Sequence, residues 1–92
     1  MRKFMIERAI PGVGKMDSCE LGGAARKSNS ALAELAPRVQ WQHSYVTGER
    51  TFCVYLAENE DAIRKHSELS GFPATKITEI TSVIDPSTAN NQ

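Results

Sequence analysis

The sequence predicts an α+β fold in which two helices cover one face of a four-stranded antiparallel sheet. A chain of 92 residues allows one domain. Apolar residues at every second position indicate strands, and apolar residues spaced by three and four indicate helices. These patterns follow one another along the chain in the order β-α-β-β-α-β. Right-handed crossovers fold that order into one sheet with both helices on the same side, the ferredoxin-like sandwich. We expect this domain over residues 1–84 and a mobile tail over residues 85–92.

The N-terminal part of the chain predicts a strand and one long helix. In residues 3–9 the side chains alternate between two faces, with Phe4, Ile6 and Arg8 on one and Met5, Glu7 and Ala9 on the other. Asp17 or Ser18 can cap the helix that follows. The apolar stripe of this helix consists of Leu21, Ala25, Ser28, Leu32 and Leu35. Pro37 stops it, so the helix is expected over residues 18–35.

The rest of the chain predicts a hairpin, a second helix and a last strand. Residues 39–47 and 51–57 are rich in strand-forming side chains and are joined by a turn. Asn59 caps the second helix, which has acidic residues in its first turn and Gly71 at its end. Residues 76–83 form the last strand.

The hairpin register decides which side chains lie on the sheet face that the helices leave open. A two-residue turn at Gly48-Glu49 places six residues there: Trp41, His43, Tyr45, Phe52, Val54 and Leu56. Ser44, Val46, Cys53, Tyr55 and Ala57 then lie beneath the helices. A one-residue change in the turn would exchange half of this assignment. Because such an open face would be a large exposed hydrophobic patch on a monomer, we expect a homodimer.

Composition and charge exclude several classes of function. Eleven Lys and Arg balance eleven Asp and Glu, so no net positive charge gathers nucleic acid or anionic lipid. No apolar run approaches the roughly 20 residues of a membrane span, and the run that begins at Phe4 is too short for a signal peptide. We therefore expect a cytoplasmic protein with no nucleic-acid or membrane partner. Cys19 and Cys53 form no CxxC pair and are expected to be free thiols.

The two histidines are the candidate metal ligands. Neutral imidazole binds first-row divalent metals, and carboxylate oxygens can complete the coordination. His43 lies mid-strand, where Glu7 and Tyr45 can share its face, and His66 lies on the second helix. The competing interpretation is a histidine hydrogen-bonded to a carboxylate at an interface. The residues alone favour it, because two histidines without a metal-binding spacing are a weak signal. No nucleophile-base arrangement stands out, so no catalytic residue is predicted.

Five segments of the chain, in order, also resemble a known family: residues 4–8, 39–46, 52–57, 62–66 and 71–74. The most specific is Trp41-Gln42-His43-Ser44-Tyr45-Val46, followed by Cys53-Val54-Tyr55. Together they are similar to a small bacterial family of domains of unknown function, DUF4242, which includes nickel-binding ferredoxin-like proteins. The resemblance implies a homodimer that binds nickel through nitrogen and oxygen ligands. It implies His43 as a ligand, with Glu7, Tyr45 and His66 as further candidates.

Three classes of function follow from these observations. The leading hypothesis is a cytosolic dimeric protein that binds nickel, or a similar divalent metal, for storage or sensing. The alternative is a small dimeric ferredoxin-like enzyme, similar to monooxygenases, that acts on an organic molecule between sheet and helices. In that case His43, Tyr45 and Tyr55 would contact the substrate, with His43 as acid or base. The third class is a protein-interaction module, and the fold alone does not choose among the three.

Overall fold

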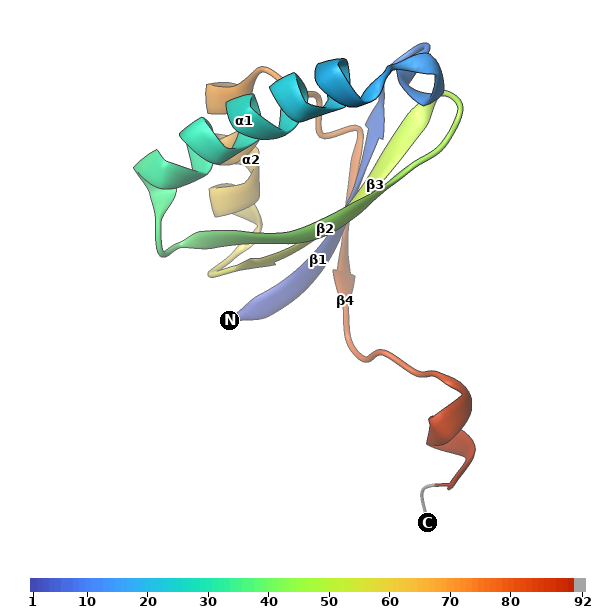
Figure 1. Ribbon diagram of the computed structural model, residues 1–92. Coiled ribbons are helices and arrows are strands. Elements are labelled where there is room, and N and C mark those ends of the chain that lie inside the picture. Colours follow the sequence, from blue (N-terminus) through green and yellow to red (C-terminus); the bar gives the residue numbers. More distant parts are fainter. Residues whose placement is uncertain (91–92) are drawn as a thin grey trace.

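The computed structural model describes residues 1–90 and contains one antiparallel sheet with two helices on one face (Figure 1). The strands are β1 (Arg2–Ala9), β2 (Val39–Val46), β3 (Arg50–Ala57) and β4 (Lys76–Ile80), arranged in the order β2-β3-β1-β4. The helices are α1 (Ser18–Leu35) and α2 (Glu60–Ser70). Two short 3₁₀ helices complete the fold, η1 (Val13–Lys15) and η2 (Pro86–Asn90). The predicted ferredoxin-like sandwich is confirmed.

Both α-helices begin and end at the residues that local chemistry indicates. Asp17 accepts a hydrogen bond from the Glu20 backbone N–H at 2.8 Å, and Glu20 accepts one from the Asp17 N–H at 3.2 Å. This reciprocal pair satisfies two amides at the start of α1. Asn59 accepts from the Ala62 N–H at 2.9 Å at the start of α2, and Gly71 ends that helix at φ 79°. Within residues 1–90 no helix is both long and apolar enough to cross a membrane.

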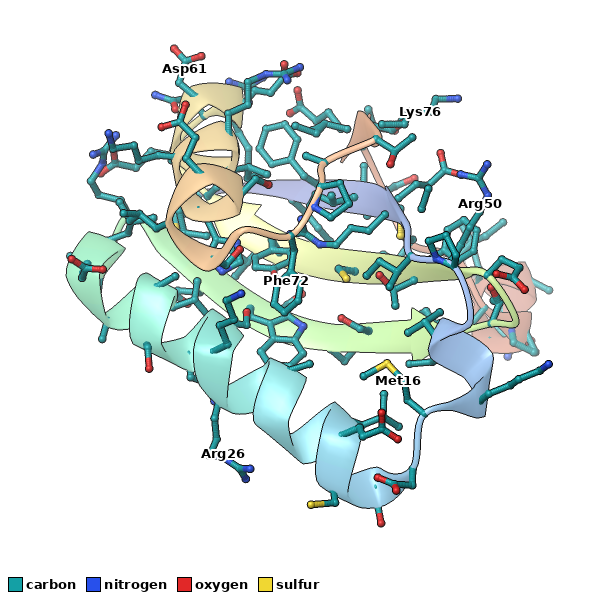
Figure 2. All side chains as sticks on the ribbon, turned by 90° about the horizontal axis from the view of Figure 1, so that it is seen from above. Met16, Arg26, Arg50, Asp61, Phe72 and Lys76 are labelled. Atoms are coloured by element: carbon teal, nitrogen blue, oxygen red, sulfur yellow. The ribbon has the colours of Figure 1, made fainter. Side chains whose placement is uncertain are left out.

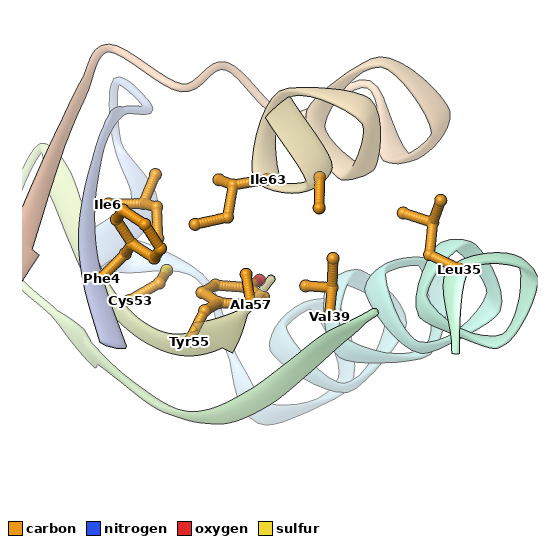
Figure 3. Packing of buried hydrophobic residues seen from close by; sticks show 9 residues of the cluster. Phe4, Ile6, Leu35, Val39, Cys53, Tyr55, Ala57 and Ile63 are labelled. Atoms are coloured by element: carbon orange, nitrogen blue, oxygen red, sulfur yellow. The ribbon is translucent and has the colours of Figure 1, made fainter. Parts of the chain in front are cut away.

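The core lies between the sheet and the helices (Figure 3). Phe4 and Ile6 of β1 face Ile63 of α2, and all three side chains are almost completely buried. The remaining members come from α1, α2 and the hairpin: Leu35, Val39, Cys53, Tyr55, Ala57 and Ala62. Because Phe4 and Ile6 face the helices, their neighbour Glu7 lies on the open face of the sheet, as the alternation predicts.

The hairpin follows the predicted register, with one exception. As expected, His43 pairs with Val54, Ser44 with Cys53, and Tyr45 with Phe52. Between Trp41 and His43 the register shifts, because Gln42 is an extra residue that forms a β-bulge. The bulge turns Trp41 to the helix side, opposite Tyr55, where its indole N–H donates to Ser44 Oγ at 2.9 Å. The prediction that Trp41 lies on the open face is therefore wrong.

The C-terminal segment leaves the sheet earlier than predicted. β4 ends at Ile80 rather than Val83, and the chain then runs away from the body of the molecule (Figure 1). Val83 and Ile84 are 70% and 77% exposed. Part of the predicted tail forms η2, in which no residue is buried. Residues 91 and 92 of that tail lie outside the described residues.

The two cysteines differ in accessibility, as the sequence predicts. Cys19 is exposed in the first turn of α1, whereas Cys53 is 5% exposed on the helix side of β3. We predict that iodoacetamide modifies Cys19 much faster than Cys53 in native buffer, because the reagent does not reach the buried sulfur of Cys53. Mass spectrometry of samples taken over time measures the two modification rates. In a urea-unfolded control the rates of Cys19 and Cys53 should converge. Equal rates in native buffer would contradict the burial of Cys53.

Candidate functional site

Three of the four predicted site residues lie on the open face of the sheet, but only His43 and Tyr45 are adjacent there. The His43 and Tyr45 rings on β2 lie 5.2 Å apart between centroids, in an edge-to-face arrangement at 84°. Glu7 shares their face but stands on β1, where it pairs with Phe52 of β3. Because Phe52 pairs on its other side with Tyr45, one whole strand separates the Glu7 carboxylate from the β2 side chains.

A groove with a volume of about 370 Å³ runs along this open face. Its lining consists of Lys3, Met5, His43, Tyr45, Val54, Ile80, Ser82 and Val83. Glu7 is not part of the lining, and Lys3 adds a positive charge to it. In the part of the chain that the structure describes, no three His, Cys, Asp or Glu side chains lie close enough together to hold a metal ion.

His66 lies on the other side of the sheet from His43. Its side chain is fully buried beneath α1, where Nε2 lies 3.2 Å from Ser28 Oγ and 3.4 Å from the Ser28 carbonyl oxygen. The imidazole ring also lies 5.3 Å from the Tyr55 ring. The structure thus separates His66 from the other three candidate ligands, and its contacts are those of a histidine within the core.

Burial lowers the pKa of His66 from its ordinary value of 6.5, and the nearby Arg8 guanidinium lowers it further. The unfolded chain therefore takes up a proton at this site at a higher pH than the folded chain does. We predict that the free energy of unfolding falls as the pH drops below about 6.5. Urea denaturation at pH 7.5 and at pH 5.5 measures this change. The free energy of unfolding should fall less between the two pH values in His66→Gln than in the parent. An equal loss in both proteins would contradict the neutral, buried state of His66.

A second hollow, with a volume of about 260 Å³, lies on the helix side between α1 and the sheet. In Figure 2, which looks down onto the helices, Met16 and Phe72 lie beside this space. Most of its lining is apolar, and it includes Trp41, which the bulge turns inward. We call this hollow the helix-side cavity. It also contains Arg8, which sequence reasoning placed among the helix-facing residues of the first strand without assigning it a role.

Arg8 is the functional candidate that sequence reasoning missed. It follows Phe4 and Ile6 on the buried face of β1 and is itself only 3% exposed. An arginine in phase with two core residues is the signal that could have revealed it, because a buried charge requires compensation.

Sequence comparison identifies the family. The sequence profile of a family described as nickel responsive protein SCO4226-like matches residues 4–80. The chain belongs to this family. The predicted resemblance to a small family associated with nickel is thereby supported, while the label DUF4242 stays a prediction. A search of curated proteins found no match.

Comparison with solved structures supports the same fold. The crystal structure of SCO4226 from Streptomyces coelicolor A3(2) matches with a TM-score of 0.74 and 18% sequence identity. The match covers 89% of this SCO4226-like chain and 99% of the other chain. At this identity the likeness shows the fold alone.

Proposed function

We propose that this SCO4226-like protein binds nickel, or a similar divalent ion, as a homodimer that stores or senses the metal in the cytoplasm. The observation that carries the proposal is the position of His43, an exposed imidazole on the sheet face that neither helix covers. Imidazole nitrogen suits nickel, and carboxylate oxygen can complete a mixed site. The family's description as nickel responsive supports nickel over the other divalent ions.

The number of metal-donor groups on each chain supports a site shared by two chains. A divalent first-row ion takes about four to six donor atoms. Each chain offers His43 with Tyr45 beside it, and Glu7 one strand further away. A two-fold axis through the open face would double each of these donors. The site is therefore proposed at the interface of two chains, with water as the remaining ligand.

The open face has apolar side chains that a second copy can cover. Met5, Phe52 and Leu56 remain partly exposed there, and Tyr45 is 58% exposed. The inward position of Trp41 removes the largest side chain that the sequence assigned to this interface. The proposed dimer therefore depends on these smaller residues and on the protruding segment 81–84, whose apolar side chains the single chain leaves uncovered.

Sedimentation at micromolar concentration, with nickel and with a chelator, tests the dimer. We expect about twice the 10.1 kDa chain mass in nickel. Leu56→Glu should give a monomer, because it places a charge among the apolar side chains of the proposed interface. Leu69→Glu, on the exposed side of α2, is the matched control and should leave the dimer intact. A monomer at all concentrations under both conditions would contradict the proposal.

The enzyme alternative has one supporting observation, the helix-side cavity. His43 and Tyr45 lie on the opposite sheet face from Tyr55, so the helix-side cavity does not bring these three predicted contacts together. His43 therefore does not act as acid or base in that cavity. What the cavity supports is the binding of an organic molecule.

A further inference from the structure

We propose that the helix-side cavity binds a small monocarboxylate with an apolar body, and that Arg8 holds its carboxylate. This site lies on the opposite face of the sheet from the proposed metal site and does not depend on it.

The first support for this proposal is the buried, positively charged guanidinium of Arg8. Its Nη1 donates to the Pro73 carbonyl at 2.8 Å, the Ser67 hydroxyl at 3.2 Å and the Phe72 carbonyl at 3.3 Å. Its other terminal nitrogen, Nη2, is buried and has no acceptor among residues 1–90. None of the four ion pairs in that part of the chain includes Arg8. A buried cation without a counter-ion is costly, so an anion that enters the cavity would be stabilised there.

The surroundings of Arg8 determine which anion fits. Arg8 is the single charged residue in the lining of the cavity. Burial and the Arg8 guanidinium lower the pKa of His66, which lies behind the cavity, so its imidazole adds no second charge at neutral pH. One guanidinium matches the charge and the planar geometry of a carboxylate. A phosphate ester carries up to two charges and would need a second cation.

The walls of the cavity determine the rest of the ligand. Met16, Leu21, Trp41, Val46 and Phe72 provide an apolar lining next to the guanidinium. A cavity of about 150 Å³ is enough for benzene, so the volume of about 260 Å³ admits a substituted ring or a medium-length alkyl chain. The ligand class is therefore a small aryl or alkyl carboxylate.

Trp41 is the single tryptophan of the chain and lines the cavity, so its fluorescence reports occupancy directly. The probes are octanoate and 1-octanol, which share an apolar chain and differ in the carboxylate. We expect octanoate to change the Trp41 emission and to bind about 10- to 100-fold more tightly than octanol, as expected for a hydrogen bond to a charged group. Equal affinity for both probes would overturn the role of Arg8, and no binding of either would overturn the site.

Two variants test the assignment further. Arg8→Gln should remove the preference for octanoate over octanol while leaving octanol binding unchanged. Ala25→Leu, which fills part of the cavity from α1, should weaken the binding of both octanoate and octanol. His43→Ala should bind octanoate like the parent, so failure of the metal proposal and failure of this one are distinguishable. If Arg8→Gln does not fold, the comparison of the two probes on the parent protein still decides the question.

Discussion

Replacing His43 with alanine is expected to abolish nickel binding while leaving the fold intact. Even residues that only position a metal ligand cost about 10- to 100-fold in affinity when they are removed. Loss of the imidazole itself should therefore lower nickel affinity by about 100-fold or more. The His43 side chain is exposed, so the far-ultraviolet circular dichroism spectrum and the urea midpoint should stay close to those of the parent. Titration calorimetry with nickel measures the loss.

Two controls make this experiment specific. His66→Gln removes the other histidine, which is buried on the opposite side of the sheet, and should bind nickel like the parent. Acidification should weaken nickel binding in the parent, because protons compete with the metal ion for its ligands. Undiminished binding by His43→Ala would place the site elsewhere. A parent that gives no heat with nickel, cobalt or zinc would remove the metal hypothesis altogether.

Replacing Ile63 with alanine is expected to produce a large loss of stability. Ile63 is fully buried on α2 and contacts the two β1 residues at the centre of the core, Phe4 and Ile6 (Figure 3). Removing such a side chain loses its transfer free energy and leaves a cavity, which costs about 2–5 kcal/mol. For a small domain with a free energy of unfolding of about 5–15 kcal/mol, this is a substantial fraction. Urea denaturation followed by circular dichroism measures the difference.

Leu69→Ala is the matched control on the same helix. Leu69 is 41% exposed, so its truncation should change the free energy of unfolding by only about 0.5 kcal/mol. If the two variants lost similar amounts of stability, the orientation of α2 described here would be wrong. This comparison tests the fold separately from any function.

The sequence was sufficient for the fold because its signals are local and agree with one another. The capping pair at Asp17 and Glu20, Asn59 before α2 and Gly71 after it all stand where the helices begin and end. Period-two alternation in β1 places Glu7 on the open face, and the turn at residues 48–49 sets the register of His43 and Tyr45. Each of these features depends on neighbours a few residues away.

The errors came from features that no local pattern reveals. The extra residue Gln42 interrupts the alternation of β2 and reverses the side on which Trp41 lies. The alternation of β1 shows Arg8 only as a helix-facing residue, because its hydrogen-bond acceptors are carbonyl groups more than sixty residues further along the chain. His66 is grouped with His43 by the family resemblance alone, although the predicted architecture already puts His43 on the face that the helices leave open and His66 on a helix.

Nuclear magnetic resonance of the imidazole rings during a nickel titration tests the central claim most directly. The chain has only two histidines, so each ring gives its own signals, and paramagnetic nickel broadens those close to the ion. We predict that substoichiometric nickel broadens the ring signals of His43 and leaves those of buried His66 sharp. Broadening of His66 before His43, or sharp signals from both at saturating nickel, would contradict a metal site on the open face.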